Sequence, residues 1–390
     1  MEVDPVVNPA RDRSAGVTSS IQARVRGAHA SRTPLRIAGQ SHWLGAGRPV
    51  AATETVSLAA NSGVVDYVPG DLTITVRAGT TLAEIARITG EQGQWFPIDP
   101  PGSDDGTIGA TVATASSGPL AHGFGTIRDL MLGVEFVTGE GKIVRGGGRV
   151  VKNVAGFDLV RLVTGSWGTL GIVTEVSLRL YALPSHRATM AMEAPTGTRR
   201  LAERLASLLN GPIMPLAMEL VSEDLARSAG LPPRPMILME LGGNATAVAA
   251  QRDALGNVGA IAEVPKEAWR KVRTTERAGA SVFRMSGLPT RLAERWERAQ
   301  RIIGPVEGAL MHASVARGTV RCILPADPST ETVGLLSKPS PDDTVIFESL
   351  PEHLWAKLSP TAISDRVSQG IKRAFDPLDI LNRGILGPSL

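Results

Sequence analysis

Glycine and other small residues are concentrated in one part of this chain, and their distribution is the feature that most constrains its fold. The chain has 42 glycines among 390 residues, and they crowd residues 102–171. Three segments are richest in small residues, and they span residues 36–45, 99–118 and 152–174. One such segment alone is usually only a turn. Together they let backbone N–H groups and short hydroxyls approach an anionic or planar ligand, and their length suits a long ligand rather than one phosphate.

The composition of the chain excludes several classes of protein. With 43% hydrophobic and 20% charged residues, the chain is typical of a soluble globular protein. Its formal net charge of +3 gives no reason to expect nucleic acid as a partner. It has no apolar run of about 18 residues and no signal sequence at its start, so we expect a cytoplasmic protein.

A single cysteine limits the redox chemistry that the chain can perform alone. Cys322 cannot form an internal disulfide, and it cannot hold an iron–sulfur cluster by itself. The glycine-rich motifs typical of NAD and ATP sites are missing, and the six histidines show no metal-binding spacing. Any redox reaction must therefore use an organic cofactor or a partner, and we expect no metal site.

The length of the chain allows two or three domains, and its patterns change along the sequence. Residues 1–15 are polar and lack periodicity, which indicates a flexible N-terminal arm. Residues 16–184 combine short strands, turns and few helices, whereas residues 185–360 have the patterns of a second α+β region. Residues 361–390 return to helix. We predict a strand over 74–78, a helix capped by Thr81 and Glu84, a hairpin over 134–144, and helices over 201–209, 219–229 and 291–303.

The three segments, in this order and spacing, resemble the FAD-binding domain of the p-cresol methylhydroxylase (PCMH) and vanillyl-alcohol oxidase superfamily. Residues Val151–Leu180 resemble more specifically the FAD-binding subunits, or E subunits, of bacterial glycolate oxidases, and Lys372–Asn382 resemble the closing motif of that family. The resemblance implies an α+β protein with a PCMH-type FAD-binding domain over 16–184. It also implies a smaller α+β cap domain over 185–360 and a C-terminal segment, 361–390, that returns to the FAD domain.

The resemblance also assigns cofactor-binding roles to individual residues of the three segments. Those expected to meet the pyrophosphate of FAD are Gly39, Gln40, Ser41 and Gly45. Those expected to line the path from the flavin to the ribityl chain are Thr107, Gly109, Ser116 and Gly118. Those expected at the far end of the dinucleotide are Gly168, Thr169 and Ile172, with Lys152 and Asn153 as further candidates.

The resemblance implies that FAD is bound without a covalent link. Covalent flavoenzymes of this superfamily have a histidine where Gln40 stands here, and His42 lies two positions later. No catalytic base is identified in the sequence. Arg317 and Arg321 could hold a carboxylate, but a lone histidine such as His312 is more often a strand or turn residue than a base.

The function that the resemblance implies is FAD binding within a glycolate oxidase complex, which oxidises glycolate, a small 2-hydroxy acid, to glyoxylate. A catalytic FAD subunit and an iron–sulfur subunit would be its partners, and any membrane association would be peripheral and through them. Two alternatives stay open. The chain could be an autonomous FAD-dependent 2-hydroxy-acid or alcohol oxidoreductase. It could also be a structural subunit with a degenerate flavin site. Ile37-Ala38 favours this alternative, because in the family that the chain resembles the first segment usually begins with glycine.

Overall fold

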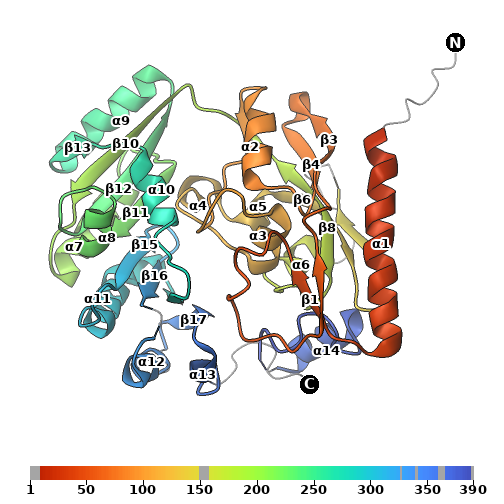
Figure 1. The fold of residues 1–390 in the computed structure, drawn as a ribbon. Helices are drawn as coiled ribbons and strands as arrows, with labels where there is room; N and C mark the ends of the chain where they lie inside the picture. Colours follow the sequence, from red (N-terminus) through yellow and green to blue (C-terminus); the bar gives the residue numbers. More distant parts are fainter. Residues whose placement is uncertain (1–8, 149–157, 326, 339–340, 359–364, 388–390) are drawn as a thin grey trace, which may run out of the picture.

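The structure is a computed structural model, and it describes residues 9–148, 158–325, 327–338, 341–358 and 365–387. Two large sheets occupy opposite halves of the molecule (Figure 1). The first sheet is antiparallel and has five strands: β3 (Val64–Val68), β4 (Thr73–Arg77), β6 (Met131–Val137), β7 (Ile143–Gly147) and β8 (Ile172–Arg179). Their spatial order is β3-β4-β8-β6-β7.

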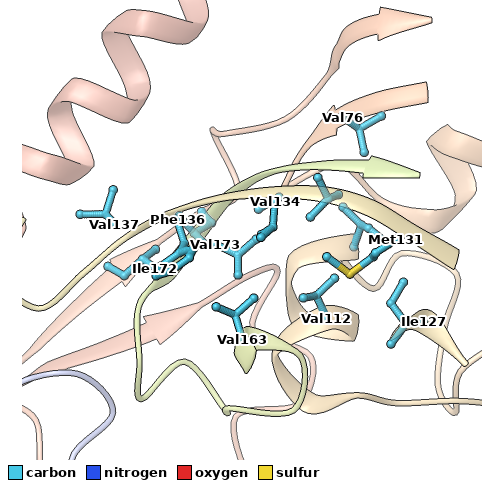
Figure 2. Close-up of a cluster of buried hydrophobic side chains, with 14 of the residues drawn as sticks. Val76, Val112, Ile127, Met131, Val134, Phe136, Val137, Val163, Ile172 and Val173 are labelled. Carbon is cyan, nitrogen blue, oxygen red and sulfur yellow. The ribbon is translucent and has the colours of Figure 1, made fainter. Parts of the chain in front are cut away.

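Helices cover both faces of this five-stranded sheet. The long helix α1 (Pro9–Ser31) lies along its outer side, where Ile21, Val25 and Ala28 join the core (Figure 1). Burying each large aliphatic side chain contributes roughly 1.5–3 kcal/mol. Three short helices supply side chains from the inner side (Figure 2): α3 (Ile108–Thr114) with Val112, α5 (Ile127–Leu130) with Ile127, and α6 (Leu159–Val163) with Val163.

A parallel pair of short strands carries the start of the first small-residue segment. β1 (Leu35–Ala38) pairs with β2 (Glu54–Ser57), and the C-terminal chain returns to the same place. Leu35 N donates to the Ile380 carbonyl at 2.7 Å, and Asn382 N donates to the Leu35 carbonyl at 2.9 Å. The helix α14 (Arg366–Phe375) precedes this return and lies beneath the first half of the molecule (Figure 1).

The second sheet is antiparallel throughout and has the order β13-β10-β12-β11-β15-β16-β14-β17. Although the cap is predicted to be the smaller part, its sheet has eight strands against five in the first half. The strands are β10 (His186–Glu193), β11 (Ala217–Val221), β12 (Met236–Gly243), β13 (Ile261–Glu263), β14 (Ser281–Ser286), β15 (Leu310–Ser314), β16 (Thr319–Leu324) and β17 (Thr344–Ser349).

The other elements connect strands or pack against the two sheets. In the first half they are η1 (Pro69–Asp71), α2 (Leu82–Gly90), β5 (Gln94–Trp95), which pairs with β9 (Tyr181–Ala182), and α4 (Ala121–Phe124). In the second half they are α7 (Thr198–Leu209), α8 (Glu223–Ser228), α9 (Ala245–Val258), α10 (Glu267–Arg273), η2 (Pro289–Arg291), α11 (Leu292–Ile303), α12 (Thr330–Leu336) and α13 (Glu352–Trp355).

Several local predictions are confirmed. The Thr81 side chain accepts a hydrogen bond from Glu84 N and caps α2. The predicted hairpin is formed by β6 and β7, and the helices predicted over 201–209 and 291–303 are α7 and α11. These patterns are local, so they need no information from distant parts of the chain.

Two local predictions are wrong. The N-terminal arm does not extend to residue 15, because α1 begins at Pro9; proline is a common first residue of a helix. The helix predicted over 219–229 begins as the strand β11 and becomes helical only in α8. Both faces of β11 are buried, because Met218 and Leu220 pack in one hydrophobic cluster and Ala217 and Val221 in another. Its sequence therefore lacks the polar–apolar alternation of a half-exposed strand. None of the described helices is long and apolar enough to cross a membrane.

Candidate functional site

The three small-residue segments meet in one place, which we call the loop cleft. The loop cleft consists of two adjoining cavities, of about 150 Å³ and about 430 Å³. Both cavities are lined by Trp43 from the first segment and by Thr107 and Thr114 from the second. Gly168 of the third segment lines the smaller cavity, and residues 276–280 of the second half close the larger one. The loop cleft therefore lies between the two halves of the molecule.

Most of the predicted cofactor-binding residues line this cleft or the space beside it. The smaller cavity is lined by Gly39, Gln40, Ser41, Thr107, Gly109 and Gly168. The larger cavity is lined by Gly45, Thr107 and Ser116. Ser116 and Gly118 also line a third and smaller cavity, which opens toward the sheet of the second half.

Two predicted residues lie away from the cleft, and two lie outside the described residues. Ile172 is fully buried in the core of the five-stranded sheet. Thr169 is also buried, and its hydroxyl donates to the Ser166 carbonyl at 2.7 Å. Their side chains therefore support the third segment and do not line the cleft. Lys152 and Asn153 lie outside the part of the chain that the structure describes.

Close contact between the first and second segments depends on Gly39. A Cβ atom at this position would overlap the hydroxyl oxygen of Thr107. Thr107 is buried and caps α3, because its side chain accepts a hydrogen bond from Ala110 N at 3.3 Å. Any side chain at position 39 would therefore displace either the first segment or the cap of α3.

Asn382 of the C-terminal segment joins the first and third segments. Its side-chain oxygen accepts from Ile37 N at 2.8 Å, and its side-chain nitrogen donates to the Trp167 carbonyl at 2.7 Å. Gly168 follows with a φ of +71°, and a Cβ atom there would lie 2.8 Å from the Asn382 nitrogen. Asn382 therefore fixes the backbone of both segments where they line the cleft.

One cation in the loop cleft has an unused hydrogen-bond donor. The Arg36 side chain lines the cleft, and its Nε atom is buried with no hydrogen-bond partner among the described residues. A different nitrogen of the Arg36 guanidinium donates a hydrogen bond to the Leu44 carbonyl at 2.9 Å. Burial lowers the pKa of this guanidinium. A buried cationic donor beside small-residue loops fits an anionic group such as the pyrophosphate of FAD.

Trp43 connects the loop cleft to the second half of the molecule. Its ring stacks on Trp167, with ring centres 5.8 Å apart, and its Nε1 donates to Glu276 at 3.1 Å. Glu276 also accepts from Arg321 at 2.7 Å, and Arg321 donates to Glu348 at 3.0 Å. Although burial alone would raise it, Arg321 and Arg284 hold the pKa of Glu348 below its ordinary value. The hydrogen bond from Trp43 to Glu276 joins the two halves beside the cleft, and the ion pairs of Arg321 hold Glu276 and Glu348 in place within the second half.

Asp99 supports the part of the second segment that faces the second half. Its carboxylate accepts a hydrogen bond from Leu120 N at 2.9 Å, and a Cβ on Gly118 would overlap its carbonyl oxygen. Asp99 also lines a cavity of about 250 Å³ between the two halves, together with Trp95, Arg187 and Arg273. Burial raises the pKa of Asp99 to about 7, although Arg273 and the Leu120 amide oppose this effect.

Stability should therefore depend on pH through Asp99. Its pKa is higher in the folded chain, so folding favours the protonated form and stability falls as pH rises from about 4 to about 7. Asp99→Asn keeps an acceptor for Leu120 N but carries no proton to lose. Between pH 5 and pH 8, wild type should lose about 2–3 kcal/mol of unfolding free energy relative to this variant. Denaturant titrations at both pH values measure the difference.

The control for this experiment is Asp253→Asn, which changes an exposed carboxylate on α9. Its pH dependence should follow that of wild type. Parallel curves for wild type and Asp99→Asn would contradict the assignment of Asp99.

Several features of this site could not be predicted from the sequence. The orphaned Arg36 nitrogen, the Asp99 support and the Glu276–Arg321–Glu348 chain depend on contacts between distant parts of the chain. Asn382 could be singled out in the sequence, because it lies in the closing motif. Its hydrogen bonds to Ile37 and Trp167 can be seen only in the structure. Among the described residues, no cluster of His, Cys, Asp or Glu could hold a metal ion.

Known proteins are similar to this chain in sequence and in fold. The family model of an FAD binding domain matches residues 13–147. Glycolate oxidase subunit GlcE of Escherichia coli (strain K12) is 34% identical over 263 residues, which cover 67% of this chain and 69% of that protein. The mitochondrial D-lactate dehydrogenase (cytochrome) of Arabidopsis thaliana is 34% identical over 177 residues, which cover 44% of this chain but only 30% of that enzyme.

Solved structures extend the likeness to nearly the whole chain. The crystal structure of p-cresol methylhydroxylase with substrate bound superposes with a TM-score of 0.75. The superposition covers 95% of this chain and 87% of that chain at 14% sequence identity. At this identity the comparison shows a shared fold, and the predicted PCMH-type α+β architecture is confirmed.

Proposed function

Because the chain belongs to the FAD-linked oxidase family that includes the glycolate oxidase subunit GlcE, we propose that it is the FAD-binding subunit of a glycolate oxidase complex. As a member of this family it is an FAD-dependent oxidoreductase, and relatives such as D-lactate dehydrogenase support a 2-hydroxy acid as its substrate class. The observation that carries the proposal is the meeting of the three small-residue segments in the loop cleft. The cleft also contains a buried Arg36 nitrogen with no hydrogen-bond partner among the described residues.

The residues of the loop cleft are suited to hold FAD. Gly39, Gln40 and Ser41 offer backbone close to Arg36, where an anionic pyrophosphate would be stabilised. Ser116 and Gly118 lie on the side that faces the second half of the molecule, where the reactive ring of the flavin would meet a substrate. When bound, FAD supplies the two-electron oxidation of an alcohol to a carbonyl.

We further propose that FAD is held without a covalent bond. Gln40 lines the loop cleft at the position that the family's covalent members give to histidine. The altered Ile37-Ala38 start of the first segment does not by itself argue for a degenerate site. Ile37 N is fixed by its hydrogen bond to Asn382, so the path of this segment is supported from outside it.

Electrons would leave this chain through partners. The chain has one cysteine, Cys322, and it is buried, with its pKa raised by burial. An iron–sulfur carrier would therefore belong to another subunit, beside a catalytic FAD subunit. The relative's name, a glycolate oxidase subunit, supports assembly with other chains.

The test is to produce the chain with and without its proposed partner subunits. We expect about one bound FAD per chain, released by denaturation without cleavage of the protein. We also expect glycolate-dependent dye reduction by the complex that falls when this chain is omitted. A colourless chain that takes up no added FAD, in a complex that keeps its activity, would favour a structural subunit. Dye reduction by the chain alone at the full rate of the complex would favour an autonomous enzyme.

A further inference from the structure

The third cavity beside the loop cleft has a polar wall and a wall of small residues. The small-residue wall contains Ser116, Ser117 and Gly118 of the second segment. The polar wall comes from five neighbouring strands of the second sheet, β11, β15, β16, β14 and β17. Its side chains are Glu219, His312, Ser314, Thr319, Arg321, Arg284 and Glu348, with Arg317 in the turn between β15 and β16.

His312 has one nitrogen engaged and one free. Its Nδ1 contacts the buried carboxylate of Glu219 at 2.8 Å. A carboxylate can only accept, so Nδ1 carries the proton and Nε2 is the basic nitrogen of the neutral ring. The Nε2 atom is buried and has no hydrogen-bond partner among the described residues, and the same is true of the Ser314 hydroxyl on the same strand. A bound ligand would satisfy both groups.

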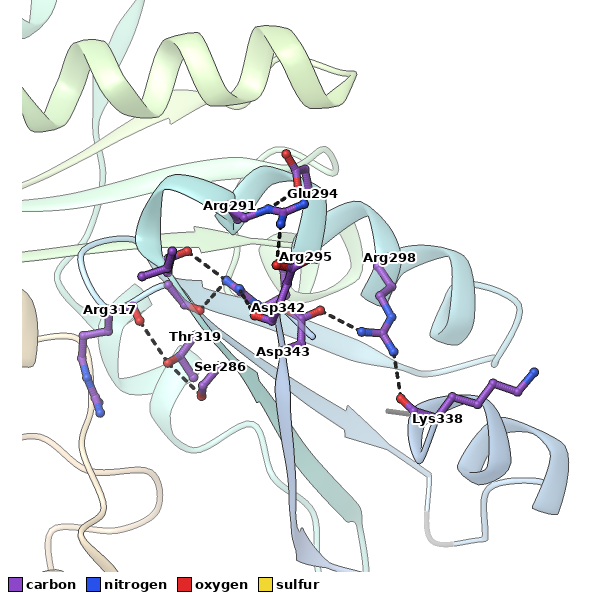
Figure 3. A network of polar contacts seen from close by, with 12 residues as sticks. Ser286, Arg291, Glu294, Arg295, Arg298, Arg317, Thr319, Lys338, Asp342 and Asp343 are labelled. Carbon is purple, nitrogen blue, oxygen red and sulfur yellow. Dashed lines mark hydrogen bonds and ion pairs between the residues drawn. The ribbon is translucent and has the colours of Figure 1, made fainter. Parts of the chain in front are cut away.

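Arg317 is a cation of this cavity that has no partner in the part of the chain that the structure describes. Its side chain extends away from the polar network that surrounds Arg295 and Asp343, toward the pale tan ribbon of the first half of the chain (Figure 3). Its guanidinium has no hydrogen bond or ion pair with any described residue of the structure, and burial lowers its pKa. The turn that carries it is fixed, because Arg295 donates to the Gly318 carbonyl at 2.8 Å.

The other two arginines of the cavity are already engaged. Arg321 donates to Glu276 and Glu348. Arg284 forms an ion pair with Glu348 at 3.4 Å, although its Nε atom has no hydrogen-bond partner among the described residues. Of the two arginines that the sequence offers for a carboxylate, the structure therefore leaves Arg317 available and occupies Arg321.

The size of the cavity limits its ligand. Its volume is about 40 Å³, and one water molecule needs about 10–15 Å³ on the same measure, so it holds about three waters. This space suits a short acid and excludes a large one. A carboxylate matches Arg317 and the Ser314 hydroxyl, and a neighbouring hydroxyl group matches the free nitrogen of His312.

We propose that this chain has its own site for a short 2-hydroxy carboxylate, in which Arg317 binds the carboxylate and His312 Nε2 accepts the hydroxyl proton. The proposal rests on the proposed function, because the electrons need the bound flavin. The hydroxyl proton passes to His312, and the α-carbon loses a hydride to the bound flavin, which leaves the 2-oxo acid. Glu219 is a positioning residue, since it fixes the orientation of His312.

The test uses the isolated full chain and two ligands. Oxalate, which cannot be oxidised at an alcohol, is titrated by calorimetry with and without FAD, and glycolate is mixed anaerobically with the FAD-loaded chain while flavin absorbance is recorded. Arg317→Gln should weaken oxalate binding by roughly ten- to a hundredfold, as expected for lost charged hydrogen bonds. His312→Gln keeps a donor for Glu219, so oxalate binding should change little, while flavin reduction should slow by roughly 10²–10⁴-fold.

Matched controls are His353→Gln, at an exposed position, and Arg199→Gln, at an exposed ion pair of α7; both should behave as wild type. A chain that binds FAD but neither binds oxalate nor is reduced by glycolate would overturn this inference and leave the proposed function intact. Wild-type behaviour of both site variants would also overturn it. If the chain takes up no FAD, the proposed function fails, and oxalate calorimetry still decides whether the carboxylate site exists.

Discussion

Replacing Gly39 with valine should weaken FAD binding by roughly ten- to a hundredfold while the chain stays folded. A Cβ at position 39 overlaps the Thr107 hydroxyl oxygen, so valine forces the first and second segments apart. Overpacking of this kind typically costs about 1–3 kcal/mol, and about 1.4 kcal/mol corresponds to a tenfold change in affinity. The segments line the loop cleft on both sides, so the strain acts on the cofactor site itself.

FAD titration of the apoprotein, followed by flavin fluorescence, measures the affinity, and circular dichroism checks the fold. The matched control is Gly27→Val, in α1, where a Cβ atom would meet nothing within 4 Å. This control should bind FAD as wild type does. An unchanged affinity in Gly39→Val would mean that the first segment does not contact the cofactor.

The sequence predicts those parts of the fold that depend on neighbouring residues. The cap of α2 by Thr81 follows from a short-range hydrogen bond between its side chain and the backbone. The β6–β7 hairpin follows from alternation around a tight turn. The strand β11 is not predicted, because its five residues are all buried and its neighbours in the sheet lie far away in sequence.

In the candidate site, too, features set by neighbouring residues are predictable from the sequence, whereas contacts between distant residues are not. Small residues identify three segments that can approach a ligand, and the structure brings these segments together. The partners that decide the chemistry are distant in sequence. Glu219 lies 93 residues before His312, so a histidine that looks isolated in the sequence is paired in the sheet. The engagement of Arg321 by Glu276 and Glu348 is likewise invisible without the second sheet.

Lys372→Met should lower the free energy of unfolding by about 3–5 kcal/mol, because it breaks a buried ion pair from one side. The Lys372 ammonium donates to Asp376 at 2.5 Å and to the Thr169 carbonyl at 2.9 Å, and it forms an ion pair with Asp379 at 2.9 Å. Methionine fills a similar volume but leaves the Asp376 carboxylate buried without its cation. Denaturant unfolding measures the loss, and Lys142→Met, which breaks an exposed pair with Glu140, should cost no more than about 1 kcal/mol.

The double variant Lys372→Met/Asp376→Leu separates the ion pair from the other contacts of Asp376. Removing both charges should recover part of the loss, since the uncompensated carboxylate is gone. Recovery should be incomplete, because Asp376 also accepts hydrogen bonds from Ile380 N at 3.1 Å and Leu381 N at 2.8 Å. Those two amides lead directly to Asn382, which holds the first and third segments. FAD affinity should therefore fall in both variants, and unchanged affinity in both would show that the C-terminal return does not support the cleft.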